Sequence, residues 1–260
     1  VSADGGAKSG QLKFRWQSSA NQYWLPRNSY LQIALHITKT NAALTDSILF
    51  TMSPADALFS LVQHQMNGTL VGSSNEPAVD GIIMKRAFMK REVKDTFGAL
   101  QGLTTEPGTL LDLTAASTMD LNYTPPLGLW ATDSIGGASH VLSVTTHSNL
   151  IDRLIQTAAW KASGACSIVI ASIRLMVAHA TPEVPIPVQR TTVVNTIDIS
   201  TQSFSHTVNG NSSAQVSVPP STRKLFVSTQ LSNLPAATAG GACVLHGLAL
   251  THLGVAFAAQ

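Results

Sequence analysis

Hydrophobic and polar residues alternate with a period of two along much of this chain. In residues 12–17, Leu12, Phe14 and Trp16 fall on one side, with polar or charged residues between them. Residues 31–38 repeat the pattern, with leucine or isoleucine at every odd position and Gln32, Ala34, His36 and Thr38 on the other face. Because successive side chains of a β-strand point to opposite faces, the alternation predicts strands that are buried on one face.

Further segments of the same kind are separated by turn residues. Asn67-Gly68 joins two of them, and Asn-Gly between apolar runs is a strong signal for a tight β-hairpin. The other predicted strands cover residues 47–52, 53–66, 69–74, 109–113, 118–125, 140–146, 166–178, 193–200, 213–218, 224–230 and 250–257. Many short strands separated by turns predict an all-β sandwich or barrel.

Residues 76–97 carry a helical pattern, with a rough apolar stripe that includes Val79, Ile83 and Phe88. A basic cluster occupies the rest of the predicted helix: Lys85, Arg86, Lys90, Arg91 and Lys94. Such a cluster can contact nucleic acid or an acidic neighbour, or it can be a solvated helix face. Phe88 is expected to be a core anchor or to lie with this helix at a subunit boundary.

Residues 122–130 form an unusual proline-rich loop. Pro125 and Pro126 end the preceding strand, and Leu127, Leu129 and Trp130 follow close together. These three side chains can cap the edge of the sandwich, or they can anchor a neighbouring subunit, where tryptophan is favoured. Both interpretations are compatible with the sequence. Under the second, Leu127, Leu129 and Trp130 are candidate residues of a subunit interface.

The surface is expected to be poor in charge. Only 12% of the residues are charged, against roughly 25% in an average soluble domain, and the net charge is +2. This balance provides no strong field that would attract nucleic acid. A weakly charged surface is consistent with one that neighbouring subunits cover, and secreted β proteins can also be low in charge.

No motif typical of serine hydrolases, zinc peptidases or phosphate-binding loops is present. His36, His64 and His206 fall in or beside strand patterns, where a hydrogen-bonded structural histidine is expected. Cys166 and Cys243 can pair or remain two buried thiols. We therefore expect a protein that is not an enzyme, binds no cofactor or metal and has no membrane-spanning segment.

The order of these features resembles that of a known family. The segments "NSYLQIALHITKTN", "PADALFSLVQHQMNGTLVGSSNEPAVDGIIMKRAF", "CSIVIASIRLMVAHATPE" and "VPIPVQRTTVVNTIDISTQSF", followed by "VSVPPSTRKLFVSTQ", are similar to jelly-roll major capsid proteins of DNA viruses. The nearest group is the double jelly-roll capsid proteins of Polintons, Polinton-like viruses and virophages. The resemblance covers roughly residues 25–235 and rests on motif order. Double jelly-roll capsid proteins are normally much longer than this chain.

The resemblance implies a jelly-roll β-sandwich. By this resemblance, the chain is either a single jelly roll or a double jelly roll whose second roll is incomplete. Under it we expect a flexible N-terminal arm over 1–10, a first jelly roll over 11–181, a linker rich in proline over 182–187, and the start of a second roll or a β appendage over 188–260. Single jelly-roll capsid proteins are the neighbouring alternative, and they usually carry a strongly basic arm that this chain lacks.

The function that the resemblance implies is that of a structural subunit of an icosahedral capsid in a virion, assembled inside the host cell. Its partners would be other copies of itself in a trimeric or higher capsomer, a minor capsid protein, and nucleic acid through weak or indirect contact. The rival hypothesis is a secreted jelly-roll carbohydrate-binding module that uses Tyr23, Trp24 or Trp130 as a sugar platform.

Overall fold

The computed structural model describes residues 1–6, 8–19, 21–41, 48–50, 54–83, 110–111, 116–155, 158–161, 164–183, 250–252 and 255–257. The chain divides into two compact units, Val1–Ser205 and His206–Gln260. The predicted strands at 193–200, 213–218 and 224–230 lie outside the described residues, as does most of the predicted linker.

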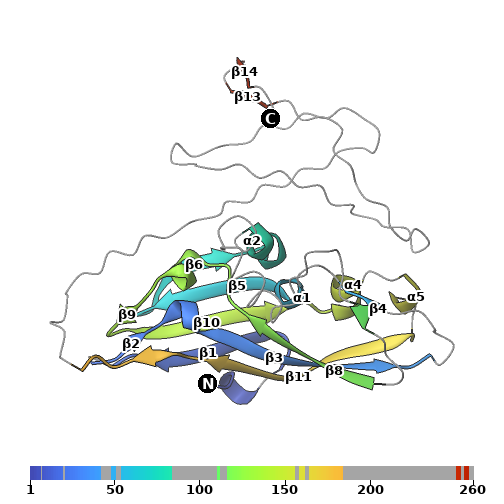
Figure 1. Ribbon diagram of the computed structural model, residues 1–260, viewed down its shortest axis with the longest axis horizontal. Helices are drawn as coiled ribbons and strands as arrows, with labels where there is room; N and C mark the ends of the chain where they lie inside the picture. The colour runs from blue at the N-terminus through green and yellow to red at the C-terminus, as the bar shows by residue number, and fades with distance from the viewer. Residues whose placement is uncertain are drawn as a thin grey trace. The chain divides into compact units, whose positions relative to one another are not determined.

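Two antiparallel sheets dominate the first unit (Figure 1). The first has the order β1-β10-β5-β6, formed by β1 (Gln11–Gln17), β10 (Ser139–Thr146), β5 (Phe59–Met66) and β6 (Thr69–Ser74). The second has the order β11-β3-β8, formed by β11 (Cys166–Met176), β3 (Tyr30–Lys39) and β8 (Ala116–Tyr123). A smaller sheet contains β12 (His179–Ala180), β2 (Tyr23–Trp24) and β9 (Ile135–Gly136).

The strand pairs are nested along the chain. β5 pairs with β6, β3 pairs with β8 outside them, and β1 pairs with β10. Outermost, Ser2 forms an antiparallel bridge with Arg174 of β11. Two further pairs, β10 with β5 and β11 with β3, join the nested pairs into two sheets. A long hairpin wound in this way is a jelly roll, so the all-β jelly-roll fold predicted from the sequence is confirmed.

The core lies on the inward faces of both sheets. Burial alternates strictly along β1, and four β3 side chains are completely buried: Leu31, Ile33, Leu35 and Ile37. At about 1.5–3 kcal/mol for each fully buried aliphatic side chain, these four contribute about 6–12 kcal/mol before entropy is counted. The net stability of a domain is typically about 5–15 kcal/mol. Loss of β3 packing would therefore remove the fold.

The hairpin predicted at Asn67-Gly68 is confirmed. β5 and β6 meet there, with positive φ values of 50° at Asn67 and 80° at Gly68. Both residue types tolerate this left-handed region, which is why Asn-Gly is favoured in two-residue hairpins. Asn67 Oδ1 also accepts a hydrogen bond from the Ser139 backbone N–H at 2.9 Å, which ties the turn to β10.

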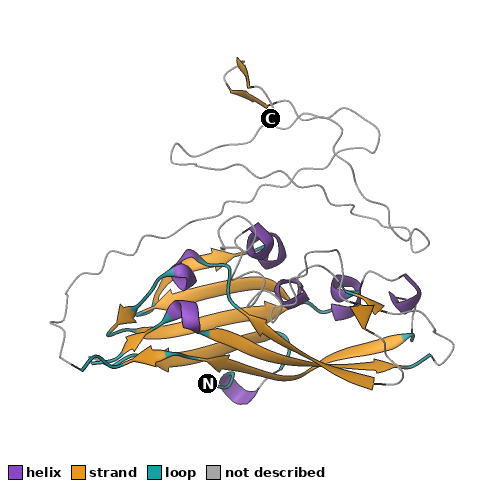
Figure 2. Ribbon diagram, viewed as in Figure 1, coloured by secondary structure: helices purple, strands orange, loops and turns teal. Residues whose placement is uncertain are grey.

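The helices are short and belong to the segments that connect or precede the strands (Figure 2). They are η1 (Asp4–Gly6), η2 (Pro26–Asn28), α1 (Pro54–Ala57), α2 (Pro77–Ile83), η5 (Gly128–Ala131), α4 (Leu150–Leu154) and α5 (Ala158–Lys161). Residues 54–57 were predicted as strand and form α1 instead, because Pro54 suits the first helical position and Asp56 suits the first turn. The helix predicted over 76–97 is described only as α2, and its remainder lies outside the described residues.

The remaining described segments are short strand pairs. β4 (Ile48–Leu49) pairs with β7 (Leu110–Leu111). In the second unit, β13 (Leu250–His252) pairs antiparallel with β14 (Val255–Phe257). The sequence predicted one strand over 250–257, and this was wrong.

The first residues of the predicted N-terminal arm contact the sheets. The Val1 ammonium donates a hydrogen bond to the Leu175 carbonyl at 2.8 Å, and the Leu175 N–H donates to the Val1 carbonyl at 2.8 Å. Ala3 is buried, and Asp4 forms an exposed ion pair with Arg15 of β1. Residues 1–4 therefore occupy part of the outer edge of β11.

Candidate functional site: the proline-rich loop and a histidine–tryptophan cluster

The proline-rich loop packs inward. Leu127, Leu129 and Trp130 are 4%, 3% and 2% exposed in the single chain, so their side chains belong to the core of the first unit. The sequence left two interpretations open, a cap on the edge of the sandwich or an anchor in a neighbouring subunit. The buried position of these side chains in the single chain corresponds to the cap. A place for this loop at a subunit boundary stays a prediction, and contact there would have to use other atoms of the loop.

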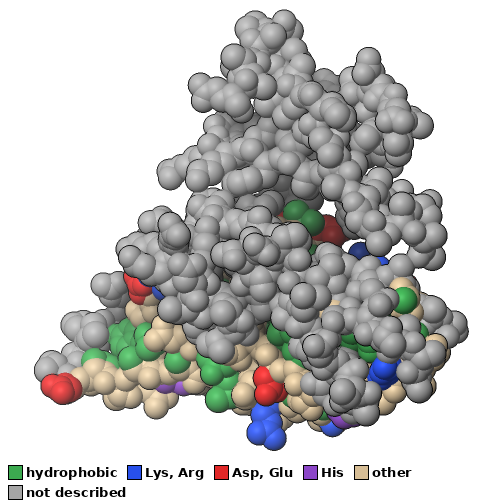
Figure 3. Space-filling view, turned by 45° about the vertical axis from the view of Figure 1, so that its right-hand side comes forward, with side chains coloured by type: hydrophobic (Ala, Val, Ile, Leu, Met, Phe, Trp, Pro, Cys, Tyr) green, Lys and Arg blue, Asp and Glu red, His purple; other side chains and the backbone are tan. Residues whose placement is uncertain are grey.

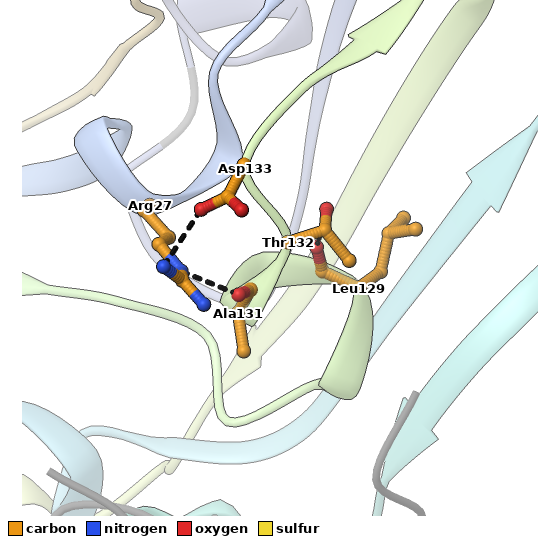
Figure 4. A network of polar contacts seen from close by, with 5 residues as sticks. All are labelled: Arg27, Leu129, Ala131, Thr132 and Asp133. Atoms are coloured by element: carbon orange, nitrogen blue, oxygen red, sulfur yellow. Dashed lines mark hydrogen bonds and ion pairs between the residues drawn. The ribbon is translucent and has the colours of Figure 1, made fainter. Parts of the chain in front are cut away.

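Arg27 of η2 holds the loop from outside (Figure 4). Its Nε donates a hydrogen bond to the Ala131 carbonyl at 2.6 Å, and its Nη1 lies 2.7 Å from Asp133 Oδ1. Within the loop, Thr132 Oγ1 donates to the Leu129 carbonyl at 2.7 Å. The Arg27 and Asp133 side chains are mostly exposed, so their ion pair contributes at most about 1 kcal/mol. We call these Arg27 contacts the Arg27 clasp.

Beneath the loop, five buried rings form a histidine–tryptophan cluster: Trp16, Trp24, Trp130, His64 and His140. Trp24 stacks on His64 with ring centroids 5.3 Å apart, and Trp16 stacks on His140 at 5.1 Å. Trp130 meets Trp24 edge to face at 5.2 Å. The rings come from β1, β2, β5, β10 and η5, so the cluster joins the first sheet to the loop.

Directed hydrogen bonds link three of these rings. Trp130 Nε1 lies 3.1 Å from His64 Nδ1, and His64 Nε2 lies 3.2 Å from His140 Nδ1. Indole N–H can only donate, so His64 Nδ1 accepts and the neutral ring carries its proton on Nε2. That proton is donated to His140 Nδ1, which places the His140 proton on Nε2. His140 Nε2 is buried and has no hydrogen-bond partner among the described residues.

Both histidines are held neutral. Burial, and then the neighbouring His140, lowers the pKa of His64 to about 3. Burial, and then the nearby His179, lowers the pKa of His140 to about 4. Removing an imidazolium from water is costly where no carboxylate compensates it, so the charged form is disfavoured. The hydrogen-bonded structural histidine predicted at position 64 is confirmed.

A second buried polar group lies between α1, α2 and β8. Asp56 and Asp80 are 0% and 4% exposed, and Ser74 Oγ donates a hydrogen bond to Asp80 Oδ2 at 2.6 Å. Burial, and then the Asp56 and Asp80 charges, raises the pKa of Tyr123 well above its usual value. A Cβ atom added at Gly81 would lie 2.4 Å from the Asp56 carboxyl carbon, so glycine permits α2 to approach this carboxylate.

The outer face of the β11-β3-β8 sheet is mostly uncharged. Two of its exposed side chains, Asp120 and Arg174, are charged. The exposed positions of this face are Gln32, His36, Thr118, Asp120, Ser167, Val169, Ala171, Arg174 and Met176. Val169 is 52% exposed and Met176 is 41% exposed. Charged side chains are also sparse on the described surface in the view of Figure 3.

Several predicted features cannot be placed. Phe88 and the basic cluster Lys85, Arg86, Lys90, Arg91 and Lys94 lie outside the described residues, as does Cys243. Cys166 is a buried free thiol whose Sγ–H points to the Trp160 carbonyl at 3.4 Å. Within the described ranges, no group of three or more His, Cys, Asp or Glu residues could hold a metal ion, and no helix is long and apolar enough to cross a membrane.

The sequence did not predict the histidine pair. His64 and His140 are 76 positions apart, and each looked like a single strand histidine. The alternation did contain a usable signal, because His64 follows Val62 and His140 precedes Leu142 on the inward side of their strands. Predicting the histidine pair also requires knowing that β5 pairs with β10. This pairing is a long-range property of the fold.

The nested strand pairs of the first unit define a jelly-roll sandwich. No protein-family model and no curated protein matches the chain. Among solved structures, it is similar to one of the Sputnik virophage, at 16% identity over 70% of this chain and 47% of that chain, with a TM-score of 0.44.

Two further structures are the mavirus major capsid protein and the PBCV-1 virus capsid. They are 9% and 10% identical over 69% and 68% of this chain, each over 44% of the other chain, with TM-scores of 0.33 and 0.32. The chain spans about half the length of these structures. The jelly-roll assignment of the first unit rests on its nested strand pairing.

Proposed function

We propose that this protein is a structural subunit of an icosahedral virus capsid and acts by assembly with other copies of itself. The observation that carries the proposal is a jelly roll with an exposed sheet face on which seven of nine exposed positions are uncharged. Interface cores are depleted in charged residues, because burying an unpaired charge is costly. On the outer face of β11-β3-β8 the two charged side chains, Asp120 and Arg174, lie on the two edge strands, and Val169 is the most exposed large apolar side chain.

The same proposal includes finer features of the assembly. The unit would be a trimeric or higher capsomer, located in the virion shell and assembled inside the host cell. A minor capsid protein and weak or indirect nucleic-acid contact are further proposed partners. Phe88, the basic cluster and the proline-rich loop would then lie near subunit boundaries. Repetition over a closed shell allows each contact to be weak.

The rival hypothesis, a carbohydrate-binding module, loses much of its proposed platform. A sugar platform needs aromatic faces open to solvent, and Trp24 and Trp130 are 0% and 2% exposed. Tyr23 is half-buried and remains accessible. The burial of both tryptophans favours assembly over glycan binding as the proposed function.

Sedimentation velocity and negative-stain electron microscopy of the purified chain test the proposal. We expect concentration-dependent species much larger than a monomer. Val169→Lys should reduce the assembled fraction at least about tenfold, because it buries a charge in the proposed contact. Leu70→Lys is the matched control: Leu70 is 51% exposed, but it lies on β6 of the other sheet. A chain that stays monomeric at all concentrations, or equal effects of both variants, would contradict the proposal.

A further inference from the structure

The three hydrogen-bonded rings of Trp130, His64 and His140 fit together only while both imidazoles are neutral. Trp130 Nε1–H faces His64 Nδ1, and His64 Nε2–H faces His140 Nδ1. An added proton must bind Nδ1 in either ring, because Nε2 already carries one. Each protonation would therefore replace an N–H···N hydrogen bond with two N–H groups that point at one another.

Among the described residues, the surroundings offer no compensation to an imidazolium. The elements packed around the pair, namely β1, β2, β5, β6, β9, β10, β12, η2 and η5, contain no Asp or Glu. Lys13 and Arg15 lie on the exposed face of β1, and the β12 residue His179 disfavours a charge on His140. Asp133 pairs with Arg27 at the surface. The cationic groups and His179 disfavour protonation of the pair, and the Asp133 carboxylate is already paired with Arg27.

We propose that Trp130, His64 and His140 form a pH-operated latch, whose protonation releases η5 and Trp130 from the core while the two sheets stay paired. His64 and His140 lie on β5 and β10, which are hydrogen-bonded neighbours within one sheet. Trp130 lies on a four-residue 3-10 helix that the Arg27 clasp holds from outside. Short elements with exposed hydrogen bonds open at lower free energy than central strands, so η5 is the part that moves.

The pH range follows from proton linkage. In the closed state the pKa values are about 3 and 4, and release of Trp130 lets water reach the pair, which moves both pKa values toward the ordinary 6.5. The closed state is therefore most stable above pH 6.5, and it loses stability as the pH falls toward the closed-state values. Between pH 7.5 and 5, the ratio of open to closed molecules should rise by at most about 10³-fold, since each histidine contributes at most about 30-fold.

The test follows tryptophan emission and near-ultraviolet circular dichroism from pH 8 to 4, with far-ultraviolet circular dichroism as the measure of strand content. We expect a reversible red shift and uptake of close to two protons while strand content is retained. The double variant His64→Gln/His140→Gln should lack this transition, because glutamine can accept and donate in the same direction but does not titrate. His36→Gln, at an exposed position of β3, is the control that should leave it unchanged.

Two single variants keep the test decisive if the double variant does not fold. Trp130→Phe removes the N–H that opposes protonation of His64, so His64 can take up its proton in the closed state and the number of protons taken up in the transition should fall. Arg27→Gln removes the clasp, so the midpoint should move to higher pH. A transition unchanged in the double variant, unchanged proton uptake in Trp130→Phe, a midpoint moved to lower pH by Arg27→Gln, or loss of strand content together with the red shift would each overturn the proposal. None of these readouts depends on capsid assembly.

Discussion

Replacing Trp130 by alanine should act on folding before it acts on assembly. The side chain is 2% exposed, packs against Trp24 and His64 at centroid distances of 5.2 and 6.0 Å, and donates a hydrogen bond to His64. A buried tryptophan replaced by alanine typically costs about 3–5 kcal/mol through lost burial and the cavity left behind. Leaving His64 Nδ1 without its donor adds about 1 kcal/mol.

Urea denaturation followed by tryptophan fluorescence measures this loss. The four tryptophans, Trp16, Trp24, Trp130 and Trp160, all lie in the unit Val1–Ser205, so the signal reports on that unit alone. With a slope of about 1–3 kcal/mol per molar urea, the expected loss moves the midpoint down by at least about 1 M. The experiment belongs at pH 8, where both cluster histidines are neutral.

Leu70→Ala provides the control, because Leu70 is 51% exposed and its loss should change the midpoint little. The reasoning from burial would be refuted if Trp130→Ala kept the wild-type midpoint but abolished large species in sedimentation. That result would mean that Trp130 leaves the core to anchor a neighbouring subunit, which is the other interpretation of the loop.

Three further substitutions probe the same unit by chemical denaturation. Tyr123→Phe should be neutral or stabilise by about 1–2 kcal/mol, because the buried Tyr123 hydroxyl has no hydrogen-bond partner among the described residues; a clear loss would show that it has one. Gly68→Ala should destabilise by about 1 kcal/mol through the φ of 80° alone, since nothing lies within 4 Å of the added methyl group; no change would mean that the turn relaxes. Gly81→Ala should destabilise by about 1–3 kcal/mol despite the better helix propensity of alanine, because its methyl group meets the buried Asp56 carboxylate; a gain of stability would show that Asp56 moves aside.

Local patterns were sufficient to predict the strands of the two large sheets, whereas the two-residue strands β2, β9 and β12 were not predicted. Leu12, Phe14 and Trp16 alternate in sequence and are all buried in β1, and Asn67-Gly68 turns the chain as its backbone preferences require. These signals succeed because the burial of alternate residues and the tolerance of positive φ are properties of a few neighbouring residues. The helix α1 was missed because a single turn of four residues has too little periodicity to be distinguished from a strand approach.

The cluster could not be predicted in the same way, because its members meet only through tertiary pairing. Trp16 and His140 are opposite one another in the β1–β10 ladder, and His64 joins them through the β10–β5 ladder. Neither register can be read from one strand. The loop showed a related ambiguity: an apolar run after two prolines is compatible with a core cap or with an exposed anchor, and only the burial of Trp130 distinguishes them.

The few charges of the two large sheets are placed where they oppose edge-to-edge aggregation. Lys13 and Arg15 lie on β1, Asp120 on β8 and Arg174 on β11, and each of these strands is at the edge of its sheet. The central strands β10 and β5 carry no Asp, Glu, Lys or Arg, and β3 carries only Lys39, its last residue. Charged residues on edge strands disfavour pairing with another chain through exposed backbone groups. Charge is thereby concentrated on the edge strands, and the central strand β3 contributes only the uncharged or neutral residues Gln32 and His36 to the exposed positions of the β11-β3-β8 face.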